Sequence, residues 1–222
     1  MAGTACSSKN RKAMEIVSPQ ESFYLSPDRL KELENKSEQG DIEALNRVVM
    51  YYMLADHNHD NMMKYLRILA EKGDPNGQYN LGYYMLSSDD QEKRNEGIIW
   101  IEKSADSGSI HAQKYLAGLY EKGGVVEQNY EKAKQWYEKA AYQGDVRSII
   151  ELSGFYLDGK GCEKNRIKAY ALLLVAELYI NRKTFMFKLV KNKKNTIALS
   201  DADSEQATIE FEQLKKMFTG KL

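Results

Sequence analysis

Four glycines, each followed by Asp or Ser, recur along this chain at intervals of about 35 residues. They stand in the pairs Gly40-Asp41, Gly73-Asp74, Gly108-Ser109 and Gly144-Asp145. Each pair ends a stretch whose apolar residues have helical spacing. A fixed period in this range is typical of helical repeat arrays, in which each unit contacts only its neighbours. Such arrays present an extended surface to a partner, so the period constrains function as well as fold.

Positions counted from each glycine describe the first helix of every unit. The fourth position is small, the eighth is aliphatic, and the twelfth is Tyr in three units of the four. The small residues are Ala44, Gly77, Ala112 and Ser148, and the tyrosines are Tyr52, Tyr120 and Tyr156. A spacing of four residues places these positions on one helix face, where small residues let a second helix approach closely.

Residues 108–144 resemble the Sel-one-like repeat family, a relative of tetratricopeptide repeats. The matching residues are Ala112, Leu116, Tyr120, Gly123, Val125, Lys132, Ala133, Trp136, Ala140, Ala141 and Gly144. The resemblance covers about residues 40–180, and it departs from the family at Ala117, where the family has glycine. It implies an all-α fold: a right-handed superhelical solenoid of about four antiparallel helix pairs, with N- and C-terminal capping helices.

The expected organisation has four parts. Residues 1–20 are a disordered leader, 21–39 an N-terminal capping helix, 40–180 the repeats, and 181–222 a C-terminal extension and capping helix. Ser26-Pro27-Asp28 is a typical helix start. In the last part, the apolar residues Ile209, Leu214, Met217 and Phe218 would cover the open end of the array.

The first residues suggest a processing event. Small residues followed by Cys6-Ser7-Ser8 resemble the mature start of a bacterial lipoprotein, although that pattern has Leu where Gly3 stands. The resemblance predicts a periplasmic protein with a lipid anchor at Cys6, and a cytoplasmic protein with an incidental cysteine is the alternative. No apolar run reaches the roughly 18–20 residues of a membrane span, so membrane contact is expected only through that anchor.

Charge and motifs exclude several classes of function. Lys and Arg total 32 and so do Asp and Glu, so the strong basic excess typical of nucleic-acid binding is absent. The segment 56–60 is the only dense cluster of potential metal ligands, with His57 and His59, and we interpret it as a polar turn. Cys162 replaces a turn valine and is expected to be a small, buried hydrophobe. We therefore expect no catalytic residues, no metal and no cofactor.

A basic run follows the last repeat. Its members are Arg182, Lys183, Lys188, Lys191, Lys193 and Lys194, and an acidic segment follows them. We interpret the run as a solvated connector facing an acidic cap. The alternative is a docking site for anionic lipid or for an acidic partner.

The resemblance to tetratricopeptide arrays assigns certain positions of each first helix to a concave surface. The candidate partner-binding residues are Asn46, Met50, Asn76, Tyr79, Tyr83, His111, Lys114, Arg147 and Ile150. Tyr, Met and Arg are typical of the cores of protein interfaces. The alternative is that Tyr79 and Tyr83 pack between neighbouring units.

These features favour a non-enzymatic module that binds another protein in its groove. The family resemblance and the lipoprotein-like start suggest a bacterial adaptor or an immunity protein that neutralises a secreted, toxic effector. Two other classes stay open: a metal-dependent or cell-wall-directed enzyme, and a self-associating scaffold.

Overall fold

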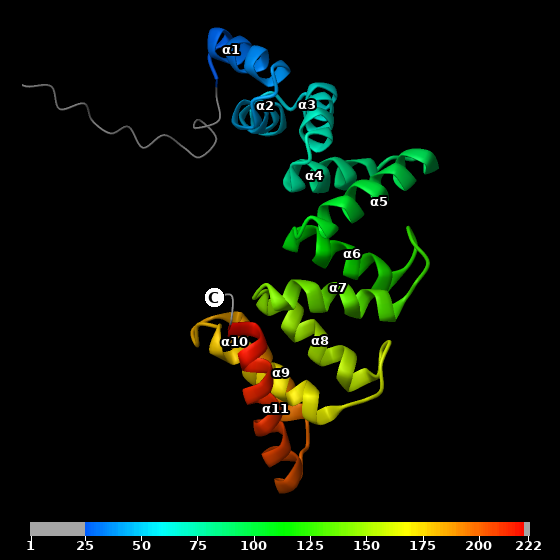
Figure 1. The fold of residues 1–222 in the computed structure, drawn as a ribbon, viewed down its shortest axis with the longest axis vertical. Coiled ribbons are helices and arrows are strands. Elements are labelled where there is room, and N and C mark those ends of the chain that lie inside the picture. The colour runs from blue at the N-terminus through cyan, green and yellow to red at the C-terminus, as the bar shows by residue number, and fades with distance from the viewer. Residues whose placement is uncertain (1–24, 220–222) are drawn as a thin grey trace, which may run out of the picture. The chain divides into compact units, whose positions relative to one another are not determined.

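The computed structural model describes residues 25–219, which form eleven α-helices and no strand. The leader expected over residues 1–20, including Cys6, lies outside the described residues. The chain divides into two compact units between Ile68 and Leu69. Figure 1 shows the helices of each unit following one another in chain order.

The first unit contains α1 (Pro27–Glu38), α2 (Ile42–Leu54) and most of α3 (His59–Glu71). Ser26 caps α1 through its side chain, as expected from the sequence. The rings of Tyr52 and Tyr65 stack with their centroids 5.8 Å apart. Both hydroxyls donate to Oε1 of Glu34, at 2.6 and 3.1 Å. One carboxylate thus ties all three helices of this unit together.

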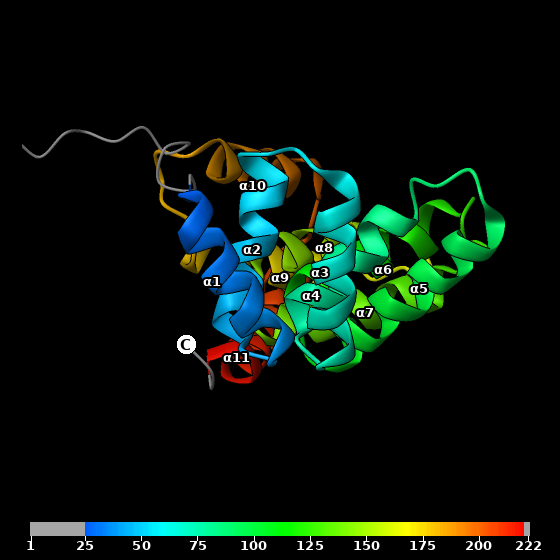
Figure 2. The same cartoon turned by 90° about the horizontal axis from the view of Figure 1, so that it is seen from above.

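The second unit consists of three helix pairs followed by two further helices. The pairs are α4 (Pro75–Met85) with α5 (Gln91–Asp106), α6 (Ile110–Lys122) with α7 (Tyr130–Tyr142), and α8 (Val146–Asp158) with α9 (Arg166–Leu178). The last helices are α10 (Phe185–Thr196) and α11 (Asp201–Thr219). Within this unit each helix of the pairs packs on the next one along the chain. Figure 2 shows the same helices from above.

The same joint links one helix pair to the next. At Gly144 the backbone is left-handed, with φ 88°. Its N–H donates to the carbonyl of Ala141, and the N–H of Asp145 donates to Ala140. This is the Schellman arrangement, and Asp145 then caps α8 by accepting from Ser148 N–H at 2.8 Å. Equivalent bonds occur at the other three joints, whose glycines are Gly40, Gly73 and Gly108.

Small residues set how closely the two helices of a pair approach. A Cβ added to Gly82 would lie 2.5 Å from the carbonyl oxygen of Gly97, and one added to Gly97 would lie 2.8 Å from that of Gly82. The corresponding pair in α6 and α7 is Ala117 and Ala133, both fully buried. The departure from the family's glycine at Ala117 is therefore matched by a small residue on the facing helix.

The tyrosines at the twelfth position make a recurring bond. Tyr120 donates to Glu102 at 3.2 Å, and Tyr156 donates to Glu138 at 3.4 Å. In both cases the acceptor is on the second helix of the preceding pair. Tyr52 makes the same bond to Glu34 of α1, so these tyrosines are structural, as their spacing predicted.

Helices α10 and α11 both pack on α9. Leu214 and Phe218 of α11 are buried, and Phe218 stacks on Tyr142 with ring centroids 5.3 Å apart. The prediction for the other two apolar residues of this helix is wrong. Ile209 is 49% exposed and Met217 is 52% exposed, because only one face of α11 meets the array. The all-α solenoid with terminal helices is otherwise confirmed.

Candidate functional site

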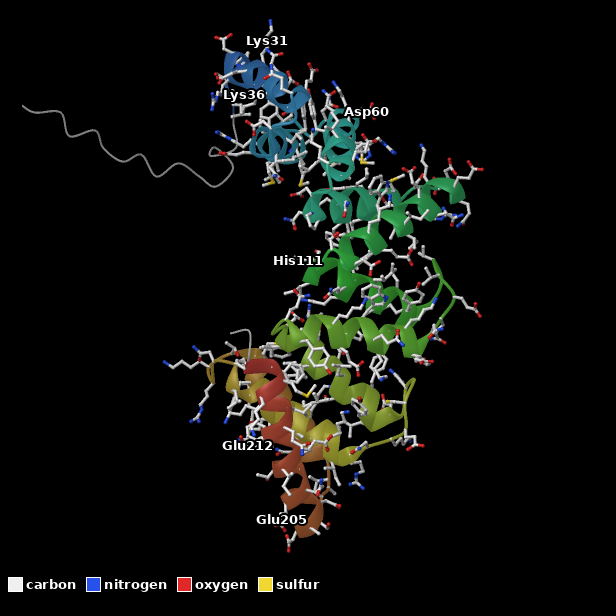
Figure 3. The ribbon with its side chains drawn as sticks, viewed as in Figure 1. Lys31, Lys36, Asp60, His111, Glu205 and Glu212 are labelled. Carbon is white, nitrogen blue, oxygen red and sulfur yellow. The ribbon has the colours of Figure 1, made fainter. Side chains whose placement is uncertain are left out.

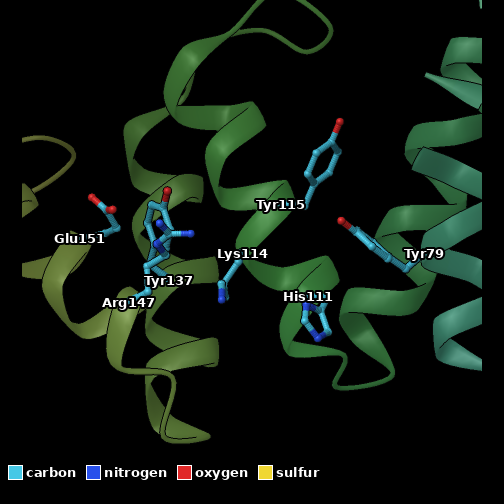
Figure 4. A pocket seen from close by; sticks show the side chains of 7 residues that line it. All are labelled: Tyr79, His111, Lys114, Tyr115, Tyr137, Arg147 and Glu151. Atoms are coloured by element: carbon cyan, nitrogen blue, oxygen red, sulfur yellow. The ribbon is translucent and has the colours of Figure 1, made fainter. Parts of the chain in front are cut away.

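A hollow of about 410 Å³ opens on the first helices of the second unit. It is lined by Tyr79, His111, Lys114, Tyr115, Tyr137, Arg147 and Glu151. These side chains come from α4, α6, α7 and α8. Figure 4 shows Tyr79 and Tyr115 at one end, His111 and Lys114 in the middle, and the other three at the opposite end. The hollow therefore has an aromatic end and a charged end.

The aromatic end is a cluster of rings. The ring centroid of Tyr79 lies 5.9 Å from that of Tyr115 and 6.3 Å from that of His111. Tyr83 extends the cluster, with its ring edge-on to Tyr115 at 5.4 Å, and it is 47% exposed. Edge-to-face contacts of this kind hold aromatic rings in place. The cluster thus offers preorganised apolar surface with hydroxyl tips.

The charged end is organised by hydrogen bonds. The ammonium of Lys114 donates to Oδ1 of Asp145 at 2.9 Å, so α6 is tied to the cap of α8. The hydroxyl of Tyr137 donates to Glu121 at 3.3 Å. Arg147, by contrast, is exposed on the first turn of α8. The guanidinium of Arg147 remains available as a donor to a partner.

The tyrosines of this hollow share one electrostatic feature. Burial, followed by the neighbouring phenols, raises the pKa of Tyr79, and burial and Tyr83 raise that of Tyr115. Burial also raises the pKa of Tyr137, with Glu121 and Glu151 adding to the effect. The three phenols therefore stay neutral and can donate or accept hydrogen bonds at neutral pH.

The structure brings four of the nine candidate residues together in the hollow: Tyr79, His111, Lys114 and Arg147. Tyr83 adjoins them through the ring cluster, and Asn76 is exposed on α4 outside the lining. Asn46 and Met50 belong to α2 in the first unit.

The placement of Ile150 differs from the prediction. Its side chain is only 3% exposed and belongs to the core of the second unit. Gly154 lies one turn after Ile150 on the same face of α8. A Cβ added at Gly154 would lie 3.9 Å from the Nζ of Lys193, which belongs to α10. A side chain of α10 therefore reaches this face, which the repeat pattern alone did not reveal.

Three lining residues were not among the candidates: Tyr115, Tyr137 and Glu151. Tyr115 and Glu151 each lie four residues after a candidate, His111 and Arg147, and so share its helix face. Extending the candidate face by one turn would have found them. Tyr137 comes from a second helix, and no single-helix pattern contains that contact.

Within the described chain, the other residues singled out for their chemistry do not line this hollow. The ring of His57 contacts the carbonyl of Met53 at 3.1 Å, and His59 begins α3. Among residues 25–219, no group of three or more His, Cys, Asp or Glu side chains is arranged to hold a metal ion. Cys162 is half-buried, and burial raises the pKa of its thiol. In the same part of the chain, no helix is long and apolar enough to cross a membrane.

The stacked helix pairs and recurring joints define an α-solenoid of the helical-repeat class. A family model for the Sel1 repeat, the same unit as the Sel-one-like repeat, matches residues 75–109, 110–145 and 146–176. Residues 75–176 of this chain are therefore three Sel1 repeats. Sel1 repeat proteins are generally protein-interaction modules and typically act as non-catalytic scaffolds.

Known relatives agree with this assignment. The uncharacterized protein YibG of Escherichia coli (strain K12) is 29% identical over 101 residues, which are 44% of this chain and 66% of YibG. The crystal structure of c5321, a protective antigen present in uropathogenic Escherichia coli strains displaying an SLR fold, matches with a TM-score of 0.70 at 23% identity. That match covers 87% of this chain and 42% of c5321.

A Sel1 repeat protein from Oxalobacter formigenes has a TM-score of 0.61 at 22% identity, over 74% of this chain and 49% of its own. The chain thus spans less than two thirds of the length of each of these relatives. At these identities the structural likeness concerns the fold.

Proposed function

We propose that this chain binds another protein through the hollow of its second unit and catalyses no reaction. The observation that carries the proposal is the tyrosine cluster next to an exposed arginine, on the first helices of three Sel1 repeats. Tyr and Arg side chains contribute a disproportionate share of the binding energy in protein interfaces. A hollow of about 410 Å³ accommodates a few side chains of a partner.

The polar tips around the hollow favour a protein partner over a small apolar ligand. Small-molecule sites are mostly apolar clefts that enclose the ligand. Here hydroxyl, imidazole, guanidinium and carboxylate groups surround a cavity that is open to solvent. Such groups match the side chains and main-chain amides of a polypeptide.

Site-specific photo-crosslinking tests this proposal. A photoreactive phenylalanine analogue replaces Tyr83, and in a matched control it replaces Ile99, which is 50% exposed on α5 and does not line the hollow. We expect one crosslinked partner from position 83 and none from position 99. Adding Tyr79→Ala to the chain that carries the analogue at position 83 should abolish the crosslink while the far-UV circular dichroism is unchanged. Equal crosslinking from positions 83 and 99, or a crosslink retained after Tyr79→Ala, would contradict the proposal.

We further propose that the partner is a bacterial protein, and that the chain acts as an adaptor or as an immunity protein against a secreted effector in the periplasm. The bacterial origin of the relatives supports the setting. The two roles differ in what the crosslinked partner does. A toxic partner whose effect on growth is relieved by the wild-type chain, and not by Tyr79→Ala/Tyr83→Ala, would establish the immunity role. A partner that is harmless when expressed alone would instead support the adaptor role.

A further inference from the structure

Helix α10 has two different faces. Val190 is fully buried, and Met186 and Leu189 are half-buried beside it, so this face packs on the array. The opposite face carries four exposed residues. They are Phe185, Lys188 and Asn192, at helical spacing, and Lys191 next to them. The outer face of α10 therefore combines an aromatic ring with cationic side chains.

The cations of this segment outnumber its internal partners. Residues 181–196 contain six Lys or Arg and no acidic residue. The ammonium of Lys194 pairs with Glu177 of α9, and Lys193 lies against Gly154. Among the described residues, no ion pair involves the remaining four cations, which are Arg182, Lys183, Lys188 and Lys191. All four are exposed.

The acidic helix that follows does not neutralise them. Within residues 25–219, no hydrogen bond or ion pair joins a carboxylate of α11 to a cation of α10. Figure 3 shows Glu205 at the end of α11 away from the ribbon of α10, where nitrogen-tipped side chains extend outward. These cations are solvated, as expected from the sequence, and in the part of the chain that the structure describes α11 does not pair with them.

The exposed aromatic residue is the second unusual feature. Phe185 is 77% exposed, the largest value for any large hydrophobic residue in the described part of the chain. Leu178, at the end of α9, is also exposed, and an adjoining hollow of about 460 Å³ is lined by Leu174, Phe187 and Phe211 among others. Apolar surface of this kind is unfavourable in water unless something covers it.

We propose that the outer face of α10 and the turn before it dock on an anionic lipid surface. Cationic side chains around an exposed aromatic ring are typical of segments that lie on such membranes, where the charges meet headgroups and the ring enters the interface. An acidic peptide would satisfy the four cations and leave Phe185 in water. This site is distinct from the hollow on α4, α6 and α8, so the proposal goes beyond the protein-binding function.

Vesicle cosedimentation of the full 222-residue chain tests the proposal. Vesicles of phosphatidylglycerol and phosphatidylcholine are compared with pure phosphatidylcholine, at low and high salt. We expect binding only to the anionic vesicles, weakened by salt because the charges are exposed. Lys188→Gln/Lys191→Gln should lower the partition coefficient by about 30-fold. Phe185→Ser should lower it by about 10-fold at low and high salt alike.

The matched control is Lys93→Gln/Lys122→Gln, which removes the same charge from exposed positions on α5 and α6. This variant should bind as the wild type does. Absence of binding to anionic vesicles, an equal loss in the control, or full displacement by soluble glycerol phosphate would overturn the proposal. Binding to polyglutamate as strong as to vesicles would point to an acidic protein instead and would also overturn it.

Discussion

Replacing Gly82 by alanine tests whether glycine is needed where α4 and α5 approach. The new methyl group would lie 2.5 Å from the carbonyl oxygen of Gly97 and 2.7 Å from Cγ1 of Ile101. A relaxed C···O contact is about 3.3–3.6 Å, so the helices must separate by close to 1 Å. The obstructing oxygen belongs to a helix backbone, which cannot rotate aside as a side chain would.

The magnitude follows from two opposing effects. Overpacking a tight contact costs about 1–3 kcal/mol, and the upper half applies because the contact is to backbone. Alanine in a helix interior gains about 1 kcal/mol over glycine. We therefore expect Gly82→Ala to lower the free energy of unfolding by about 1–2 kcal/mol. In the matched variant Gly118→Ala, the new methyl group contacts only the Tyr137 hydroxyl, at 4.0 Å. This variant should raise the free energy of unfolding by about 0.5–1 kcal/mol.

Thermal unfolding followed by circular dichroism and by tryptophan fluorescence, which reports on Trp100 of α5 and Trp136 of α7, measures both variants. For a unit of this size about 1 kcal/mol corresponds to 2–4 °C, so the midpoints should differ by roughly 3–12 °C, with that of Gly118→Ala the higher. Midpoints are compared because repeat arrays need not unfold in two states. If Gly82→Ala unfolds at or above the wild-type temperature, or if both variants fall equally, the close-approach argument is refuted.

Three further predictions concern individual bonds. Tyr52→Phe removes the hydroxyl that donates to Glu34 at 2.6 Å and should cost about 1 kcal/mol in urea unfolding. Ser107 occupies the position that Gln143 holds one repeat later, where the side-chain amide of Gln143 donates a hydrogen bond. The Oε1 of Gln78 is buried and, among the described residues, unpaired. Ser107→Gln should supply a donor to this oxygen and so raise the urea midpoint. Burial raises the pKa of Asp145, but the hydrogen bonds from Lys114 and Ser148 lower it by more, so the pKa of this carboxyl lies below its ordinary value. Its stabilisation is therefore present above the ordinary pKa of 3.8 and lost as the pH falls below it. Between pH 7 and pH 3, Asp145→Asn should lose less stability than the wild type.

The repeat period predicted most of the architecture because the signals are local. A glycine at φ near 90°, an Asp or Ser after it and a small residue three positions later each act within one turn of helix. The same locality explains why four of the candidate residues lie in the hollow. A position on a first helix faces the same way in every unit, so counting from Gly108 or Gly144 places His111 and Arg147 correctly.

The failures involve contacts between segments that do not follow the period. Ile150 has the right helical position for an exposed surface, but its side chain is buried in the core of the second unit. Tyr137 lines the hollow from a second helix. The exposure of Ile209 and Met217 depends on how α11 is rotated against α9. Each of these depends on the packing of the terminal helices or on neighbouring helices, which a count along one helix does not contain.

The joint at each glycine also bears on how such a chain evolves. Its bonds involve only the residues just before and just after the glycine, so the joint carries no information about which repeat it connects. A duplicated segment such as 110–145 would arrive with a complete joint at its end. The protein can therefore gain or lose recognition surface in whole repeats by recombination within its gene, without new residues being selected to reconnect the helices.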